Sequence, residues 1–310
     1  MMPELTPGPH KTSGILIVDK PQGMSSAQLT GCIKKIHGID KIGHSGTLDP
    51  MATGVMICGI NQATRIFPFF LDRPKKYAAV LRLGVETDTL DATGNIVATQ
   101  PFNRVSEAAV RNACRQFEGE ISQIPPAYSA LKHKGKPLYK YARQGAPVVK
   151  SARKVFIFAI DVRTVHFPEV HIDVECSSGT YIRTLCADIG RTLECGAHLS
   201  ALTRTECGGY SIHDALSLED IASHRSLATL AGNLISMSDA LPEIPLVVAG
   251  DGLMEKIKHG KPLSAADVMP VGDEGLPLLK LIDGNNRLLA VVRRDESSDR
   301  YNYCCVFCNP

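Results

Sequence analysis

Two hydrophobic periods alternate along the chain, one typical of strands and the other typical of helices. The short apolar run Gly14–Asp19 predicts a strand, and Gly54–Gly59 predicts a second strand that is buried. Between them, apolar residues at i, i+3, i+4 and i+7 predict a helix that Ser25 or Ser26 caps and Gly38 ends. The apolar residues of this helix are Leu29, Cys32, Ile33 and Ile36.

The pattern continues after the second strand. A loop is expected over Lys41–Pro50, and a further helix is expected to begin at Asn61. Tyr77–Leu83 alternates, which predicts a strand with one apolar face. That face carries Tyr77, Ala79, Leu81 and Leu83. Ser106 is a suitable N-cap for a helix whose apolar side carries Val110, Ala113, Cys114 and Phe117.

A long stretch from Ile121 to about Lys154 lacks a clear period, and we expect it to be irregular. It contains Pro125-Pro126 and one possible short helix, Leu138–Gln144, which Gly145 would close. An insertion of this length in a compact domain is usually functional or disordered.

The alternating residues Glu169–Cys176 then predict a half-exposed strand, a helix follows over Ile182–Leu193, and His198–Thr205 predicts another strand. Strands and helices do not alternate strictly, and the strands are half-polar. These features favour an α+β domain with a mixed, mostly antiparallel central sheet flanked by helices.

The pattern changes near Pro242–Pro245. The remaining residues predict a short strand, a helix near Leu253–His259, and a hairpin in which Gly284-Asn285-Asn286 joins Leu278–Ile282 to Leu288–Val292. We therefore divide the chain into a large domain, residues 1–242, and a small β-rich domain, residues 243–310.

Composition narrows the class of protein. The chain has 310 residues, 44% hydrophobic and 21% charged, which is typical of soluble globular proteins with a sizeable core. No apolar run is long enough to span a membrane, and the N-terminus does not resemble a secretory signal, so we expect a cytoplasmic protein. The ten cysteines are then expected to be free. Cys304, Cys305 and Cys308 form a single Cys-x-x-Cys cluster, for which a packed terminal strand is the simpler interpretation than a metal site.

Charge indicates nucleic-acid binding only in one segment of the chain, where basic residues are concentrated. The net charge of +2 is too small to indicate nucleic-acid binding by itself. From Lys132 to Lys154, however, eight residues are Lys or Arg and none is Asp or Glu. Such density suits phosphate binding, although a solvated basic loop would have the same composition.

Two segments carry candidate chemistry. Lys41–Gly54 is rich in glycine and contains His44 and the Asp49-Pro50 dipeptide, which by itself usually forms only a turn. In the second segment, Arg183 follows the turn at Gly179 and lies in the first turn of a predicted helix. A cation is unfavourable at that end of a helix, so we expect a carboxylate or a phosphate beside it, unless it simply faces water.

Several ordered segments resemble the TruB family of tRNA pseudouridine synthases. They are Asp19–Ser26 (DKPQGMSS), Gly43–Gly54 (GHSGTLDPMATG), Lys75-Lys76-Tyr77, Leu83–Gly94 (LGVETDTLDATG), Ile124–Leu131 (IPPAYSAL), Cys176–Thr184 (CSSGTYIRT), Cys195–Leu199 (CGAHL) and Leu202-Thr203-Arg204. Together they cover nearly the whole chain in order, whereas any one of them would be a weak match. The tail Tyr301–Pro310 departs from the family pattern, so an RNA-binding role for the C-terminal, PUA-like module is not implied for it.

The resemblance implies roles for individual residues. Asp49 matches the essential carboxylate of the family and Arg183 its partner. Tyr77 matches the residue that stacks on the extruded uracil and is a candidate for handling the C5 proton, and His44 the residue that helps to displace the target nucleotide. Lys20, Pro21 and Leu202 match residues that shape the pocket. The stretch about 124–154, with Lys132, Lys134 and Lys136, matches an insertion that grips RNA.

The reaction implied is isomerisation of the T-loop uridine, position 55 of tRNA, to pseudouridine. It breaks a C–N bond and forms a C–C bond on the same base, so it requires no metal, redox group or other cofactor. The partner implied is the T stem-loop of tRNA, without guide RNA, and we expect a monomer. Alternatives are a catalytic subunit directed by a separate RNA, an RNA-binding protein that has lost catalysis, and an unrelated metabolic enzyme.

Overall fold

The computed structural model describes residues 12–268 and 276–307. In this part of the chain, nine strands form one sheet in the order β1-β3-β12-β4-β11-β10-β7, with β2 paired to β3 and β13 to β12. The nine strands are β1 (Gly14–Lys20), β2 (Ile42–Ser45), β3 (Thr53–Ile60), β4 (Lys75–Leu83), β7 (Gly119–Gln123), β10 (Arg153–His166), β11 (Glu169–Cys176), β12 (Ala197–Cys207) and β13 (Tyr210–Ser211). Every neighbouring pair is antiparallel except β3 and β12. The expected mixed, mostly antiparallel sheet is confirmed.

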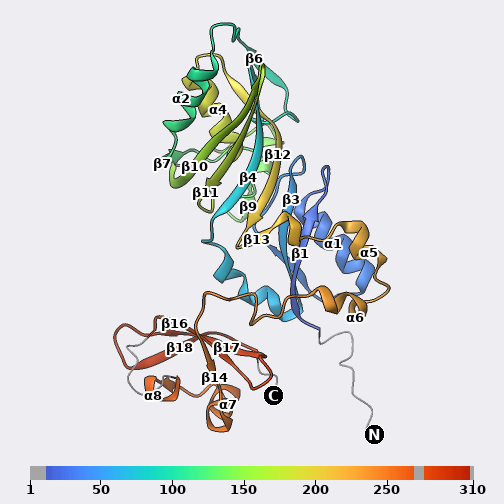
Figure 1. The fold of residues 1–310 in the computed structure, drawn as a ribbon, viewed down its shortest axis with the longest axis vertical. Coiled ribbons are helices and arrows are strands. Elements are labelled where there is room, and N and C mark those ends of the chain that lie inside the picture. Colours follow the sequence, from blue (N-terminus) through green and yellow to red (C-terminus); the bar gives the residue numbers. More distant parts are fainter. Residues whose placement is uncertain (1–11, 269–275, 308–310) are drawn as a thin grey trace.

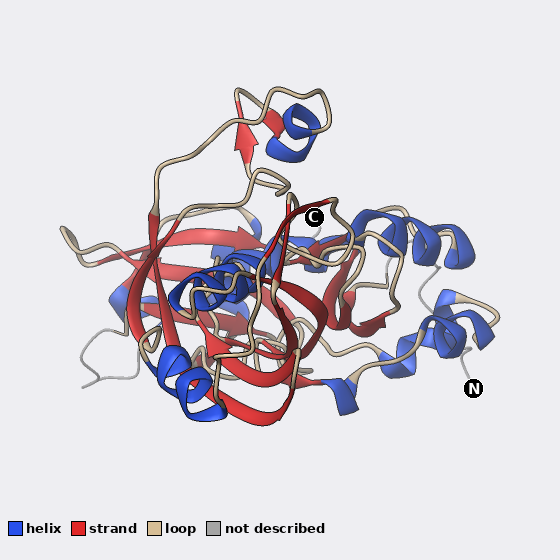
Figure 2. Ribbon diagram, turned by 90° about the horizontal axis from the view of Figure 1, so that it is seen from above, coloured by secondary structure: helices blue, strands red, loops and turns tan. Residues whose placement is uncertain are grey.

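Helices flank both parts of this sheet (Figure 1). Beside β1 and β3 lie α1 (Ser26–His37), α5 (Leu218–Ser223) and α6 (Leu227–Leu230). At the other end of the sheet, α2 (Glu107–Arg115) lies beside β10, and α4 (Ile182–Thr192) packs against β12 and β4. Seen from above, helices lie on the left and on the right of strongly twisted strands (Figure 2). The flanking helices expected for an α+β fold are therefore present.

The first helix shows why the local sequence folds as it does. Ser25 caps α1 by accepting a bond from the Gln28 amide, and Gln28 completes a capping box. Gly38 ends the helix with φ at 60°, a left-handed conformation that glycine adopts without strain. Both ends therefore follow the prediction. In the same way Ser106 caps α2, and the predicted apolar face of β4 is buried.

Three sequence predictions are wrong in detail. The expected loop Lys41–Pro50 contains β2, which pairs with β3. The helix at Asn61 is the 3-10 helix η1 (Asn61–Phe70), which contains Pro68, a residue without an amide hydrogen. The stretch 121–154 is not irregular throughout, because it contains the ends of β7 and β10, the hairpin β8 (Lys132–His133) with β9 (Lys136–Pro137), and α3 (Leu138–Ala142).

The C-terminal residues form a separate five-stranded sheet in the order β14-β16-β17-β18-β15. Its strands are β14 (Leu246–Val248), β15 (Leu263–Ser264), β16 (Leu278–Ile282), β17 (Leu288–Arg294) and β18 (Arg300–Val306), with α7 (Asp251–Lys258) and α8 (Ala265–Val268) beside them. The predicted β-rich character and the β16–β17 hairpin are confirmed. The division of the chain after residue 242 stays a prediction.

The remaining short elements connect these parts. They are the pair β5 (Val85–Thr87) and β6 (Ile96–Thr99), and the 3-10 helices η2 (Ile212–Asp214) and η3 (Ala231–Asn233). One buried cluster combines Ile57 and Phe70 of the large sheet region with Leu288 and Val291 of β17. The second sheet therefore packs directly against the body that carries the candidate site.

The cysteine tail lies partly in β18, where Cys304 is exposed and Cys305 is buried. A packed terminal strand is thus the correct interpretation for these two residues, whereas Cys308 lies outside the described residues. No group of His, Cys, Asp or Glu that could hold a metal occurs in the described ranges. Nor does any helix found there have the length and apolar character to cross a membrane.

Candidate active site

Asp49 lies in the turn that connects β2 to β3. The turn closes with a hydrogen bond from the Ala52 amide to the Asp49 carbonyl, so the Asp-Pro segment is a turn, as its sequence predicts. Ser26 fixes the preceding residue, because its hydroxyl donates to the Leu48 carbonyl and also accepts from the Leu48 amide. The helix start at α1 therefore holds the backbone from which the Asp49 side chain projects.

Arg183, at the start of α4, contacts the Asp49 carboxylate. Its Nε lies 2.9 Å from Oδ2 of Asp49, and its side chain is only 4% exposed. The two terminal nitrogens donate to the carbonyls of Thr89 and Tyr128 at 2.9 and 2.8 Å. The unfavourable position of Arg183 in the first turn of a helix is thus offset by a carboxylate, one of the two anions that the sequence allows.

Asp91 is a second carboxylate at this position, which the sequence did not single out. Its Oδ2 lies 3.7 Å from Nε of Arg183, and its side chain is 6% exposed. Its other oxygen accepts bonds from Thr89 and Thr93. The only sequence signal was its place in the segment Leu83–Gly94, since 92 residues separate it from Arg183 in the chain (183 − 91).

Burial and charge act on Asp49 in opposite directions. Burial raises the pKa of the Asp49 carboxyl, and the Arg183 guanidinium is the main influence that lowers it again. Asp91 raises it further, whereas Lys20 lowers it. Without Arg183, the carboxylate would therefore lose its principal source of stabilisation in the ionised form.

Lys20, at the end of β1, lies beneath the turn that carries Asp49. Its Nζ donates to the carbonyls of Pro21 and Met24 at 2.8 and 2.7 Å and approaches the Pro50 carbonyl at 3.5 Å. Burial lowers the pKa of the Lys20 ammonium to about 8, and Asp49 opposes this shift. Lys20 therefore braces the turn that carries Asp49, whereas the role of Lys20 and Pro21 as the pocket floor stays a prediction.

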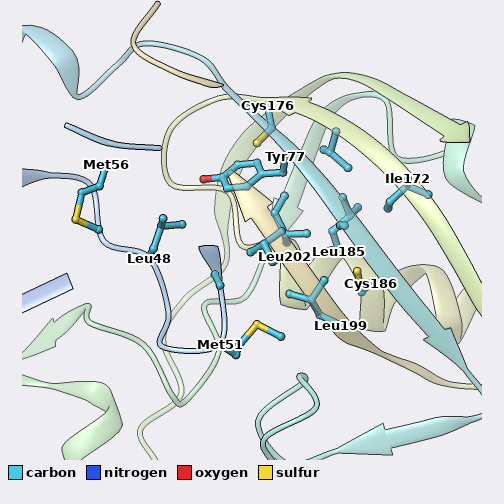
Figure 3. Close-up of a cluster of buried hydrophobic side chains, with 14 of the residues drawn as sticks. Leu48, Met51, Met56, Tyr77, Ile172, Cys176, Leu185, Cys186, Leu199 and Leu202 are labelled. Atoms are coloured by element: carbon cyan, nitrogen blue, oxygen red, sulfur yellow. The ribbon is translucent and has the colours of Figure 1, made fainter. Parts of the chain in front are cut away.

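Tyr77 and Leu202 come from the neighbouring strands β4 and β12 and are 7% and 8% exposed. Figure 3 shows the Tyr77 ring extending from β4 with Leu202 beside it and Leu48 on the side to which its hydroxyl points. Burial raises the pKa of the Tyr77 hydroxyl to about 12, and Arg204 opposes that effect. An aromatic face and an apolar side chain thus lie in the same buried cluster as Leu48, the residue before Asp49.

His44 lies on β2, half-buried, opposite Cys58 of β3. Its Nδ1 is buried without a hydrogen-bond partner among the described residues. Burial lowers the pKa of the His44 imidazole, as does the nearby charge of Arg204. The neutral imidazole is therefore favoured, with one ring nitrogen available to a further group.

The three lysines of the insertion do not lie in the pocket. Lys132, Lys134 and Lys136 belong to the β8–β9 hairpin, whose tip is formed by Lys134 and Gly135, both at positive φ. Lys136 lies over the Tyr141 ring at 4.6 Å and donates to Gln144. The root of the insertion nevertheless reaches the site, because the Tyr128 carbonyl accepts from Arg183.

Comparisons with known proteins show the family to which the chain belongs. Residues 34–182 match the family model "TruB family pseudouridylate synthase (N terminal domain)", and residues 183–236 match "tRNA pseudouridylate synthase B C-terminal domain". The fold and site thus define a pseudouridylate synthase. The chain belongs to the TruB family.

Relatives from several bacteria cover the chain closely. The tRNA pseudouridine synthase B of Syntrophotalea carbinolica is 44% identical over 95% of this chain and 98% of its own length. That of Syntrophus aciditrophicus is 39% identical over 93% of each. Among solved structures, a Cbf5-Nop10-Gar1 complex contains a chain that is 27% identical, with a TM-score of 0.69 over 90% of this chain and 78% of that one.

Proposed function

We propose that this protein isomerises the T-loop uridine of tRNA to pseudouridine as a stand-alone, monomeric enzyme. The observation that carries the proposal is the 2.9 Å contact between the Asp49 carboxylate and the buried Arg183 guanidinium. The near full-length likeness to bacterial enzymes named tRNA pseudouridine synthase B supports tRNA as the substrate.

The chemistry requires an ionised carboxylate close to the ribose or the base. Asp49 supplies it, because Arg183 favours the charged form against the effect of burial. Arg183 also spans the Thr89 and Tyr128 carbonyls, so its position is fixed before RNA arrives. The carboxylate is therefore preorganised for the step in which the glycosidic bond breaks.

The target base must leave its stack before Asp49 can reach it, and this extrusion costs about a few kcal/mol. Stacking on Tyr77 offsets part of that cost. Leu202 completes the apolar wall, Lys20 and Pro21 hold the pocket floor, and His44 helps to displace the target nucleotide.

The β8–β9 hairpin grips the stem of the RNA in this proposal. Lys132 and Lys134 are exposed at the hairpin and have no carboxylate partner among the described residues. Lys136 lies on the adjacent strand β9, where it donates to Gln144, and in this proposal all three ammonium groups contact phosphate.

The test uses purified protein and an unmodified tRNA transcript without cofactor or guide RNA. We expect one T-loop uridine to be converted, and a mass measurement of the active species in solution to equal one chain. Asp49→Asn is expected to abolish conversion while tRNA still binds. Glu219→Gln, the same chemical change on the exposed surface of α5, serves as the matched control. Conversion only in the presence of a guide RNA would contradict the proposal.

A further inference from the structure

Arg204 is the most deeply buried cation in the described part of the large sheet region after Lys20, with 1% of its surface exposed. It lies on β12 opposite Tyr77 of β4 and Gly54 of β3. Its Nε donates to the Val55 carbonyl at 2.7 Å, and one terminal nitrogen donates to the Gly46 carbonyl at 3.3 Å. Tyr77 is its cross-strand neighbour, and the guanidinium lies close enough to the Tyr77 hydroxyl to lower the pKa of that hydroxyl. One side chain therefore connects β3, the loop before Asp49, and Tyr77.

Arg204 differs from Arg183 in having no counter-charge. Arg183 has two carboxylates within 4 Å, whereas no ion pair within the described ranges includes Arg204. Its charge instead disfavours protonation of the neighbouring Lys20, His44 and Lys75, and contributes to the lowered pKa of each. Burying a cation without a counter-charge costs free energy, so fold stability alone is a poor reason for a guanidinium here.

The two groups near Arg204 that can acquire negative charge are the Tyr77 hydroxyl and the Cys58 thiol. Cys58 is 0% exposed, so the group that bears on the reaction is Tyr77, the residue proposed to meet the base. The Val55 and Gly46 acceptors are backbone carbonyls, which do not ionise. An RNA phosphate would have to displace the loop at Gly46 to touch a guanidinium that is 1% exposed. The Tyr77 phenol, in contrast, belongs to the residue that is paired with Arg204 across β4 and β12.

We infer that Arg204 is a positioning residue that holds the Tyr77 hydroxyl and stabilises negative charge on its oxygen while Tyr77 removes the C5 proton of the reattached uracil. The inference rests on the proposed function. In this step the phenolate oxygen takes the proton from C5. The electron pair of the broken C5–H bond forms the C5–C6 double bond, and the former C6–N1 double-bond pair moves to N1, which takes a proton from solvent. Tyr77 returns to phenolate by releasing its proton to solvent.

The titration of Tyr77 agrees with this role. Burial raises the pKa of the hydroxyl to about 12, and Arg204 is the first influence that lowers it. With Arg204 in place the pKa of the hydroxyl is still about 12, so the phenolate is a minor species near neutral pH, but it is a strong base when it forms. Removal of Arg204 would raise the pKa of the hydroxyl further, so the phenolate would form even more rarely.

The experiment compares tRNA transcripts that carry hydrogen or deuterium at C5 of uridine, in single-turnover reactions. Arg204→Met is expected to slow product formation by about 10²-fold, the lower end of general-base effects, and to raise the C5 isotope effect above that of the unchanged protein. Ser26→Ala is the matched control, because it releases the same loop at Leu48 without removing a charge. It is expected to slow the reaction with an unchanged isotope effect.

Arg204→Lys keeps the charge but reaches fewer acceptors, so it provides a second measurement if Arg204→Met does not fold. We expect a smaller loss of rate, part of which is recovered when Tyr77 is replaced by the more acidic 3-fluorotyrosine. A wild-type isotope effect in a folded Arg204→Met, or no recovery by fluorotyrosine, overturns the role of Arg204. An unchanged protein that makes no pseudouridine would instead overturn the proposed function, and this inference with it.

Discussion

Replacing Arg183 by methionine tests the electrostatic design of the site. The change removes a buried cation that lies 2.9 Å from Asp49 and 3.7 Å from Asp91, together with its bonds to the Thr89 and Tyr128 carbonyls. Methionine keeps most of the apolar volume, so the loss is mainly one of charge and hydrogen bonds. Asp49 and Asp91 then lose the cation that they share, and Lys20 is left as a weaker influence on Asp49.

Breaking a buried ion pair in this way typically costs about 3–5 kcal/mol. The Asp49 side chain is 34% exposed, so water screens it in part, and Asp91 keeps its bonds from Thr89 and Thr93. Both facts favour a free-energy cost at the lower end of this range, about 3 kcal/mol. A loss of that size lowers the melting temperature by roughly 6–12 °C for a domain of this length.

The loss should depend on pH, and the direction follows from linkage. Without Arg183, the pKa of Asp49 in the folded protein lies further above its unfolded value, so the folded state binds more protons. Stability of the variant therefore falls as pH rises, and its deficit relative to the unchanged protein is larger near pH ~8 than near pH ~5. The chain contains no Trp, so thermal unfolding is best followed by far-UV circular dichroism. A variant as stable as the unchanged protein, or a deficit that is the same at both pH values, would refute the reasoning.

Three further predictions use other parts of the structure. Turnover should decline as the pH is lowered, with a midpoint above the ordinary Asp pKa of about 3.9, because burial raises the pKa of Asp49. Turnover that stays constant down to a pH of about 3.9 would contradict this. Neutralising Lys132, Lys134 and Lys136 together should weaken tRNA binding and reduce the slope of log affinity against log salt by up to about 3. Unchanged affinity would show that the β8–β9 hairpin does not bind the RNA. Gly54→Ala should prevent folding, since Gly54 has φ at 102° and an added Cβ would overlap the Arg204 carbonyl. The control is Gly31→Ala, whose added Cβ meets open space. Solubility and circular dichroism measure the effect of both changes.

Elements whose ends and faces are determined by residues close in the sequence can be predicted from the sequence alone. The Ser25 cap and Gly38 stop of α1 and the alternation in β4 are of this kind. The strand β10 was not anticipated, because a register shift between Ile157 and Ala159 interrupts its period of two. The β8–β9 hairpin has strands too short to show any period.

The residues of the candidate site also fall into those that the sequence predicts and those that it does not. Asp49 as a turn residue and Arg183 as a cation in need of an anion are both visible in their own segments, and the family resemblance joined them. Asp91 and Arg204 were missed, because their importance depends on partners from distant strands. Tyr77 and Arg204, for example, meet only through the pairing of β4 with β12. No spacing in the sequence encodes that contact.

The most direct test of the central claim is a mass-spectrometric map of every uridine in a tRNA transcript after incubation with the purified protein alone. The account predicts pseudouridine at one T-loop position, and none when Asp49→Asn replaces the unchanged protein. Conversion at another position, or full conversion by Asp49→Asn, would contradict it.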